Sequence, residues 1–176
     1  LNTTTDQHPS DLIGWWAFES GNGSIAYDHS GSSNDGTLTG FPHRDATLQN
    51  TTDWTTGRYD GGIGLAGNNE YLSILNAKMN GSTFGDSITM MGWYKPSDTG
   101  LDVTSDLIVI QDDLVLSSTD TGFACKIKNN TAANDIATWS HSDAYEGEWV
   151  HLACTYNGNG DHCIRLYVDG ELKDSD

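Results

Sequence analysis

Short apolar segments separated by turn residues are the feature that most constrains how this chain can fold. Runs rich in aromatic and β-branched residues recur along its 176 residues, with glycine, asparagine, aspartate or proline between them. No segment carries the apolar period of a long amphipathic helix. The 20 glycines suit turns, and the apolar runs suit strands. The pattern predicts an all-β protein, folded as a sandwich or a barrel.

Six segments are predicted as strands. Residues 12–20, "LIGWWAFES", contain no polar run, so we expect a strand that is buried on both faces. The strand at residues 87–96 is expected to stop at Pro96, because proline cannot donate to a sheet ladder. Residues 41–60 show no clear period. The other predicted strands are residues 69–75, 106–112, 113–118 and 122–129.

The strongest hairpin signal lies in residues 148–174, "EWVHLACTYNGNGDHCIRLYVDGELKD". If Gly158 and Asn159 form a two-residue turn, Ala153 faces Ile164 across the hairpin. This register gathers apolar side chains on one face, which we predict to be the core face. His151 is interpreted as a partly buried histidine of this hairpin. The predicted core face holds Trp149, Ala153, Ile164, Leu166 and Val168, and the opposite face holds Val150, Leu152, Tyr156, Arg165 and Tyr167.

Three cysteines leave the disulfide pattern open. The hairpin register sets Cys154 opposite Cys163, close enough for a bridge. A Cys125–Cys154 bridge between neighbouring strands is the alternative, and three unpaired thiols that pack as small apolar groups are a third interpretation. No basic cluster or helix N-terminus accompanies any of them, so none is expected to be a nucleophile.

An excess of acidic residues excludes two classes of partner. Eight lysines and arginines stand against 25 aspartates and glutamates, which gives a formal net charge of −17. Such a field repels nucleic-acid phosphates and anionic lipids. No apolar run approaches the roughly 18 residues that a membrane span needs. We therefore expect neither nucleic-acid binding nor membrane insertion.

Five Asn-x-Ser/Thr sequons mildly favour an exported protein. Because the sequence begins at Leu1 rather than at methionine, we expect a processed chain or an excerpt of a longer one. The sequons begin at Asn2, Asn22, Asn50, Asn80 and Asn129.

Four segments, in their order and spacing, resemble the laminin-G-like domains of the concanavalin A-like lectin/glucanase superfamily. They are "GWWAFESGNGSIAYDHSGSSNDGTLTG", "GRYDGGIGLAGNNEYLSI", "SITMMGWYKP" and "GEWVHLACTYNGNGDHCIRLYVDGELKD". The resemblance implies an antiparallel jelly-roll sandwich of two sheets over residues 12–176, after an extended lead-in at residues 1–11. It also implies an extracellular, cell-surface or virion location.

One part of the family pattern has no counterpart here. In the family a further strand follows the "YVDG" hairpin and lies beside the first strand, whereas this sequence ends at Asp176. We expect a sandwich that lacks its final strand, because an open aromatic edge invites pairing. The hypothesis is completion by a longer parent chain or by a strand from a neighbouring subunit. Closure of that edge by residues 1–11 would refute it.

The loop "DHSGSSNDGTL", residues 28–38, is the candidate metal site. A phosphate cradle would need a following helix and often a lysine, and neither is present. The resemblance implies a calcium ion held by Asp28 and Asn34, with Glu19 and Asp35 as neighbouring oxygen donors. The alternative is an Asx-turn, in which Asp28 and Asn34 cap backbone amides.

Catalytic patterns are absent from the sequence. A glucanase on this architecture needs paired carboxylates, spaced E-x-D-x-x-E on one strand face, and no such spacing occurs. Glu146 and Glu148 come nearest and are interpreted as solvated loop acids. No histidine or cysteine has zinc-ligand spacing. We predict a protein without enzymatic activity.

Two functions follow, and a third, glycoside hydrolase or lyase, is disfavoured. The first is a carbohydrate-binding or adhesion module, with calcium as a possible aid. The second is a structural subunit of an extracellular filament, surface layer or virion. Aromatic rings and polar side chains outside the core would hold a glycan. The candidates are Trp54, Tyr59, Trp139, Tyr145, Tyr156, Arg165 and Tyr167.

Overall fold

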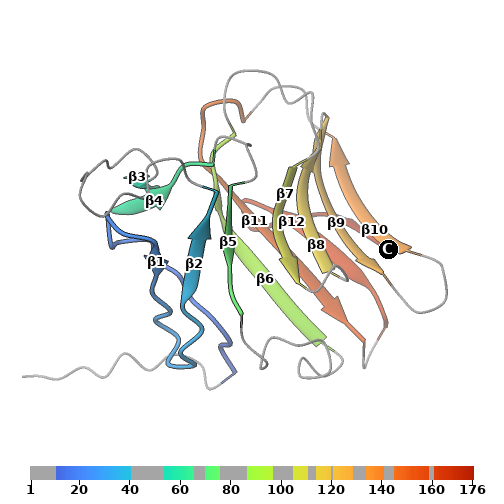
Figure 1. Cartoon of the computed structure of the whole chain (residues 1–176). Helices are drawn as coiled ribbons and strands as arrows, with labels where there is room; N and C mark the ends of the chain where they lie inside the picture. Colours follow the sequence, from blue (N-terminus) through green and yellow to red (C-terminus); the bar gives the residue numbers. More distant parts are fainter. Residues whose placement is uncertain are drawn as a thin grey trace, which may run out of the picture. The chain divides into compact units, whose positions relative to one another are not determined.

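A computed structural model describes residues 11–40, 54–65, 70–75, 87–96, 105–110, 114–119, 121–128, 134–140, 145–158 and 161–176. The chain divides into two units, Leu1–Ala77 and Lys78–Asp176, and each is described by itself. The described residues form strands and no helix (Figure 1), so none of them belongs to a helix that could cross a membrane. The predicted all-β class is confirmed.

The first unit contains two small antiparallel sheets. Strands β1 (Ile25–Ala26), β2 (Gly36–Thr39) and β5 (Tyr71–Ser73) form one of them, in the order β1-β2-β5. Strands β3 (Trp54–Thr56) and β4 (Gly61–Ile63) form a hairpin. Ala26, Leu38 and Trp54 are buried together in this unit. The prediction of a strand within residues 69–75 is confirmed by β5, whereas β3 lies where the sequence shows no period.

The predicted strand at residues 12–20 is wrong. This segment contributes only an isolated bridge between Trp16 and Asp28, and Trp15 is exposed. Phe18 has a φ of 59°, a left-handed conformation that interrupts extended backbone. The backbone here lies so close to β4 that a Cβ on Gly61 would stand 2.1 Å from the Phe18 carbonyl oxygen. This continuous apolar run therefore belongs to a segment that forms no strand ladder of backbone hydrogen bonds beyond one isolated bridge.

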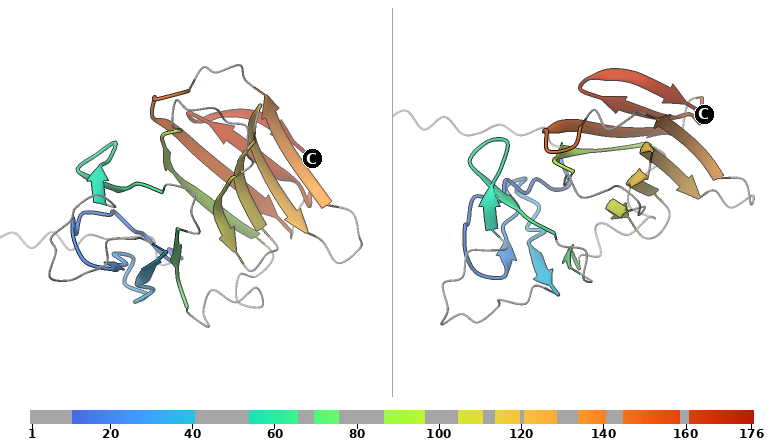
Figure 2. Two further views of the ribbon diagram at one scale, coloured as in Figure 1. Left: turned by 45° about the horizontal axis from the view of Figure 1, so that its top comes forward. Right: turned by 90° about the horizontal axis from the view of Figure 1, so that it is seen from above.

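The second unit is a sandwich of two four-stranded antiparallel sheets. One sheet has the order β10-β9-β8-β7 and the other β13-β12-β11-β6. The right-hand view of Figure 2 shows the two layers of this unit from above. The strands are β6 (Ser87–Tyr94), β7 (Ser105–Ile110), β8 (Leu114–Thr119), β9 (Gly122–Lys128), β10 (Asn134–Ser140), β11 (Val150–Asn157), β12 (Ile164–Val168) and β13 (Glu171–Ser175).

The core of this sandwich lies between the two sheets. Every second residue of a strand points to the same side, so alternate apolar side chains from both sheets meet there. Leu116, Phe123 and Ala137 come from one sheet, and Leu152 and Ile164 from the other. Predicted strands at 87–96, 106–112, 113–118 and 122–129 are confirmed as β6, β7, β8 and β9. Strand β10 was not predicted.

The predicted register of the last hairpin is wrong. Tyr156, rather than Ala153, pairs with Ile164, a shift of three residues along β11. The loop is longer than a two-residue turn: the first ladder pair is Tyr156 with Ile164, and within the loop the His162 amide donates to the Asn157 carbonyl at 3.0 Å. An odd shift exchanges the two faces of a strand. Ile164, Leu166 and Val168 are buried as predicted, but on β11 the buried residues are Val150, Leu152 and Cys154.

The hairpin that follows conforms to local turn chemistry. Asp169 and Gly170 connect β12 to β13 with φ values of 50° and 81°. Positive φ at both central residues defines the turn type that Asp-Gly favours. This turn aligns Val168 with Glu171.

The disulfide of this unit joins Cys125 to Cys154. The predicted Cys154–Cys163 bridge is wrong, and the alternative that the sequence left open is correct. Cys154 points into the core toward β9, whereas Cys163 precedes β12 in the loop and keeps its thiol. The shifted register separates the two residues that the shorter turn would have paired.

Candidate functional site

The predicted calcium loop of the first unit is organised around the carboxylate of Asp28. Its Oδ1 accepts the amides of Trp15 and Ser30 at 2.9 and 2.8 Å. Its Oδ2 accepts the Ser30 hydroxyl at 2.8 Å and the Asn34 amide at 2.9 Å. Two donors per oxygen occupy the lone pairs of the carboxylate. For Asp28 this is the amide-capping role that the sequence offered as the alternative to a metal site, whereas the Asn34 side chain donates to a carbonyl rather than capping an amide.

The same contacts stabilise the charged form of Asp28. Partial burial raises the pKa of Asp28, but hydrogen bonds from the amides of Trp15, Asn34 and Ser30 outweigh burial. Together with the bond from the Ser30 hydroxyl, they hold the pKa of this carboxyl below its ordinary value. The hydrogen bonds of the loop therefore favour the ionised form of Asp28.

The other predicted calcium ligands also serve the loop. The Asp35 carboxylate accepts the Asp28 amide at 2.9 Å. Asn34 is buried, its side-chain amide donates to the Ile13 carbonyl, and its own carbonyl accepts the Trp16 indole. Glu19 is exposed in a turn. Nowhere in the described part of the chain do three His, Cys, Asp or Glu side chains gather to hold a metal.

Calcium needs six to eight oxygen ligands. With its lone pairs taken by protein donors, Asp28 does not fit that role in this arrangement. The calcium site stays a prediction, which a titration can test.

Two glycan candidates lie in the first unit and differ in accessibility. Trp54 is buried, and its indole donates to the Gly23 carbonyl at 2.9 Å. The prediction that Trp54 is a stacking platform is wrong, because its ring is used in the core of this unit. Tyr59 is 65% exposed at the tip of the β3–β4 hairpin, with the Arg58 guanidinium 5.3 Å from its ring centre.

Trp139 and Tyr145, two further candidates, come together in the second unit. Their ring centres lie 5.8 Å apart, and both rings also contact Phe123. The Lys173 ammonium stands 5.0 Å from the centre of the Trp139 ring. Burial, then the charge of Asp169 and a hydrogen bond to it, raise the pKa of Tyr145. Both rings are partly buried and pack against the core of this unit. This packing role is the alternative to a platform for sugar stacking.

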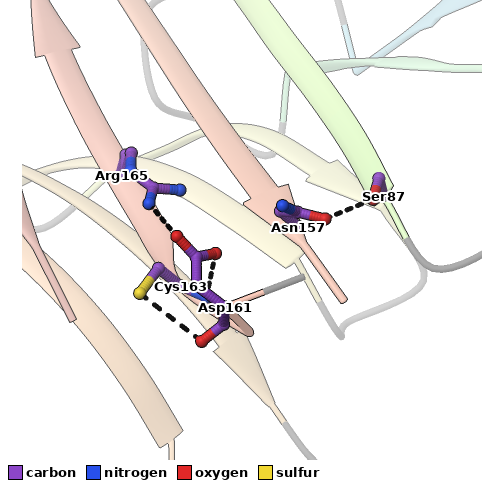
Figure 3. Close-up of polar contacts among 5 residues, drawn as sticks. All are labelled: Ser87, Asn157, Asp161, Cys163 and Arg165. Carbon is purple, nitrogen blue, oxygen red and sulfur yellow. Dashed lines mark hydrogen bonds and ion pairs between the residues drawn. The ribbon is translucent and has the colours of Figure 1, made fainter. Parts of the chain in front are cut away.

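The last hairpin does not place its three candidates on one face. Tyr156 packs against the core of the second unit, so its predicted position on the opposite face is wrong. Arg165 and Tyr167 lie on that opposite face. Figure 3 shows the Arg165 guanidinium bonded to the Asp161 carboxylate beside Cys163, with the Ser87–Asn157 contact on the neighbouring strands.

An aromatic pair of exposed Trp93 and half-buried His151 lies on the same face, on strands β6 and β11. Trp93 of β6 pairs with His151 of β11, and their ring centres lie 5.3 Å apart in an edge-to-face arrangement. Trp93 is 40% exposed. Neither residue was among the predicted ligand-binding residues. The signal that could have found them is alternation in "SITMMGWY", where Met91 and Trp93 share a face.

Two further rows of side chains cross this face of the sheet. Met91, Ala153, Tyr167 and Leu172 pair successively across all four strands, with Met91 and Leu172 more than half exposed. Thr89, Thr155 and Arg165 form a polar row beside them. We call the side chains of Trp93, His151, Met91, Ala153, Tyr167, Leu172, Thr89, Thr155 and Arg165 the outer face.

A family model described as the concanavalin A-like lectin/glucanases superfamily matches residues 66–176 of the chain. The chain belongs to this superfamily. The matched residues include all of the second unit, with its outer face. No curated protein sequence matches the chain. Membership of this superfamily supports a lectin-like, carbohydrate-binding module in general.

The superfamily's description joins lectins with glucanases, so the position of carboxylates matters. Among the described residues, Asp169 directly follows β12 and approaches this row, because its amide donates to the His151 carbonyl at 2.8 Å. Its Oδ1 accepts the His151 amide at 3.0 Å, and its Oδ2 accepts the Tyr145 hydroxyl at 3.3 Å. Asp169 therefore joins the turn after β12 to the start of β11 and to the turn at Tyr145.

The sequons can be placed only in part. Asn22 lies exposed in the bend before β1, where an attached glycan would face solvent. Asn2, Asn50, Asn80 and Asn129 lie outside the described residues.

Proposed function

We propose that this chain is a non-catalytic, exported carbohydrate-binding module whose glycan surface is the outer face. The observation that carries the proposal is the exposed Trp93 ring, packed edge-to-face against the half-buried His151, on the same side of a regular sheet as Met91 and Tyr167. An indole ring offers an apolar plane on which the C–H face of a pyranose can stack. Neighbouring polar groups then fix the orientation of the sugar.

The polar groups of the outer face suit sugar hydroxyls. The hydroxyls of Thr89 and Thr155 both donate and accept hydrogen bonds, and the His151 imidazole can do either. Arg165 contributes less, because its guanidinium is already paired with Asp161. An extended glycan would therefore run along β6 and β11, from the ring of Trp93 past Met91 to the threonine row.

The negative net charge of the chain favours neutral glycans over anionic ones. A net charge of −17 repels sulfated, phosphorylated and carboxylated sugars at moderate ionic strength. We infer that the ligand is a neutral glycan. Export is supported by the Cys125–Cys154 disulfide, because such bridges form in oxidising compartments.

Absence of catalysis is part of the proposal. Retaining hydrolysis needs two carboxyl groups about 5 Å apart, flanking the scissile bond. None of the residues that make up the outer face is acidic, and the adjoining Asp169 is already engaged by two donors. The surface can bind a sugar without a general acid or a nucleophile.

A glycan array probed with the whole chain, followed by calorimetry on the best neutral oligosaccharide, tests this function. We expect Trp93→Ala to weaken binding about tenfold or more, as for a central aromatic contact. The matched control is Tyr71→Ala, which removes an exposed aromatic ring from the other unit at a position that is not a glycan candidate. Equal binding by Trp93→Ala and the parent, or no glycan bound at all, would overturn the proposal. An arm with chelator shows separately whether calcium assists.

A further inference from the structure

Two adjacent methionines of β6 lie in opposite environments. Met90 is 6% exposed and belongs to the core of the second unit, whereas Met91 is 59% exposed. Successive residues of a strand point to opposite faces of a sheet, so Met91 lies on the outer face and Met90 faces inward. One short strand therefore carries a thioether that is exposed to solvent and another that is packed in the core.

The register of β6 on β11 accounts for this difference. Met91 pairs with Ala153, whose side chain is a single methyl group, so no long side chain covers the thioether from the paired position on β11. Met90 pairs with Cys154, which is fully buried and bridged to Cys125. The exposure of Met91 thus follows from its place in the sheet.

Met91 also lies in the middle of the surface to which we assign glycan binding. On β6 it is two residues from Trp93 and two residues from Thr89, and all three share the outer face. Two residues along a strand span about 7 Å. A glycan that stacks on the Trp93 ring and reaches the threonine row therefore passes over Met91.

We propose that Met91 is a peroxide-sensitive modification site, and that its oxidation to the sulfoxide weakens binding of a neutral glycan to the outer face; this rests on the function proposed above. The Cys125–Cys154 disulfide is consistent with an oxidising compartment, where such an oxidant acts. Methionine sulfoxide can be reduced again by sulfoxide reductases. The modification is therefore reversible.

The oxidation needs only the Met91 thioether and one molecule of hydrogen peroxide. The sulfur attacks one peroxide oxygen, so that an S–O bond forms as the O–O bond breaks. The proton of the transferred oxygen passes to the departing hydroxide, which leaves as water. Sulfur loses two electrons and peroxide gains the same two, and the products are the sulfoxide and water.

The sulfoxide changes what Met91 offers to a sugar. Oxidation replaces a flexible apolar side chain by a polar one. The C–H face of a pyranose then loses an apolar contact beside the Trp93 ring. Water bound to the sulfoxide oxygen must also be removed when the sugar binds, and the burial of a polar group without a hydrogen bond is unfavourable.

The first measurement is the site of oxidation in the whole chain under dilute hydrogen peroxide. All samples carry Cys163→Ala, because the free thiol of Cys163 also reacts with peroxide. Tandem mass spectrometry locates the added oxygen within β6. We expect Met91 to be oxidised at least about tenfold faster than Met90, since susceptibility follows exposure. Equal rates at the two methionines would overturn the assignment of the site.

The second measurement is the affinity for the best neutral oligosaccharide, by calorimetry before and after peroxide. We expect oxidation to weaken binding by the parent about fivefold or more, as for loss of a contact within the binding surface. Treatment with methionine sulfoxide reductases should restore it. Met91→Leu keeps an apolar side chain without sulfur, and its affinity should stay within about twofold with or without peroxide.

A polar replacement tests the physical reason for the effect. Met91→Gln places a polar side chain at the same position and should weaken binding without any peroxide. The matched control is Val109→Gln, because Val109 is 45% exposed on the other sheet, away from the outer face. This control should bind within about twofold of the parent. Both variants should melt near the parent temperature, because both positions are exposed.

The possible failures are distinguishable. An equal effect of peroxide on the parent and on Met91→Leu would place the sensitive residue elsewhere and overturn the proposal. Unchanged affinity when Met91 is fully oxidised would overturn it too, while glycan binding by the outer face would stand. No binding by the unoxidised parent would overturn the proposed function, and this proposal with it.

Discussion

Cys125 of β9 and Cys154 of β11 connect the two sheets of the second unit through the middle of its core. Both residues are fully buried, and their Cα atoms lie 5.8 Å apart. The bridge closes a loop with a sequence separation of 29 residues, which includes β10 and the turn before β11. It therefore ties together elements that would otherwise be separated in the unfolded chain.

Removal of this bridge should strongly destabilise the sandwich. A disulfide that closes a loop of this length contributes about 3.5 kcal/mol in the chain-entropy account. We expect the double variant Cys125→Ala/Cys154→Ala to lose roughly that free energy of unfolding in a denaturant titration. Cys163→Ala is the control and should change it by less than about 0.5 kcal/mol. Peptide mapping that finds Cys163 bridged would contradict the assignment.

Replacement of Asp28 by asparagine should loosen the loop of the first unit. The introduced amide would present an NH₂ group to donors that now face a carboxylate oxygen, and hydrogen bonds to a charged group contribute about 1.5–3 kcal/mol. We expect Asp28→Asn to speed hydrogen exchange of the Trp15, Ser30 and Asn34 amides. Asp60→Asn removes an equal charge from an exposed turn and should leave them unchanged.

Acid should have the same effect through protonation. Because the pKa of Asp28 is lowered in the folded chain, its ionisation stabilises the fold fully above the ordinary aspartate pKa near 4. That contribution is lost as the pH falls through the lower, folded value. The protection factors of the Ser30 and Asn34 amides, which compare their exchange with the intrinsic rate at each pH, should fall below about pH 4 in the parent. They should change less in Asp28→Asn. A parent loop insensitive to acid would contradict this role.

Calcium should have little effect on the first unit. The lone pairs of Asp28 already accept four donors, so an ion would have to displace them. We expect the melting temperature to differ by less than about 1 °C between excess calcium and chelator. A rise of several degrees that Asp28→Asn abolishes would establish the calcium site implied by the family resemblance.

Loss of the Asp174 carboxylate, which accepts the Thr138 amide at 2.7 Å, should expose the edge of β10. Asp174→Ala should speed exchange of the Thr138 amide and cost about 1–3 kcal/mol, because that amide loses a charged acceptor. Glu171→Ala, which removes an exposed acid from the same strand, should leave exchange of the Thr138 amide unchanged, because a solvent-exposed ion pair contributes little to stability. Unchanged exchange at Thr138 in Asp174→Ala would show that solvent replaces the carboxylate at no cost.

Much of the architecture was predictable because it depends on local chemistry. Strands β6 to β9 follow from alternating apolar residues bounded by proline, aspartate or glycine, and the Asp169–Gly170 turn needs only two residues that tolerate positive φ. Strand β10 and the short strands β1 to β4 were missed, because neighbouring strands rather than their own sequences stabilise them. For residues 12–20 the opposite error occurred, because a strand was predicted where none forms. Apolar content alone predicts burial of side chains and not backbone pairing with another strand.

The candidate site was less predictable, because it depends on contacts between distant segments. The same Asp and Asn side chains suit a calcium cage or an Asx-turn, and only the positions of the Trp15 and Ser30 amides distinguish them. Trp93 meets His151 only through the β6–β11 register. The glycan candidates chosen for a polar context included Trp54, which the fold buries.

The sequence by itself determined the all-β class, the superfamily and the positions of most strands, because period-two patterns and turn residues act within a few residues. Tertiary structure alone decided the register of β11 on β12, the Cys125–Cys154 pairing and the side chains of the outer face. The physical reason is that a slip of three residues preserves every local preference of β11 but exchanges its faces. Packing of Val150, Leu152 and Cys154 against the other sheet selects one face for the core.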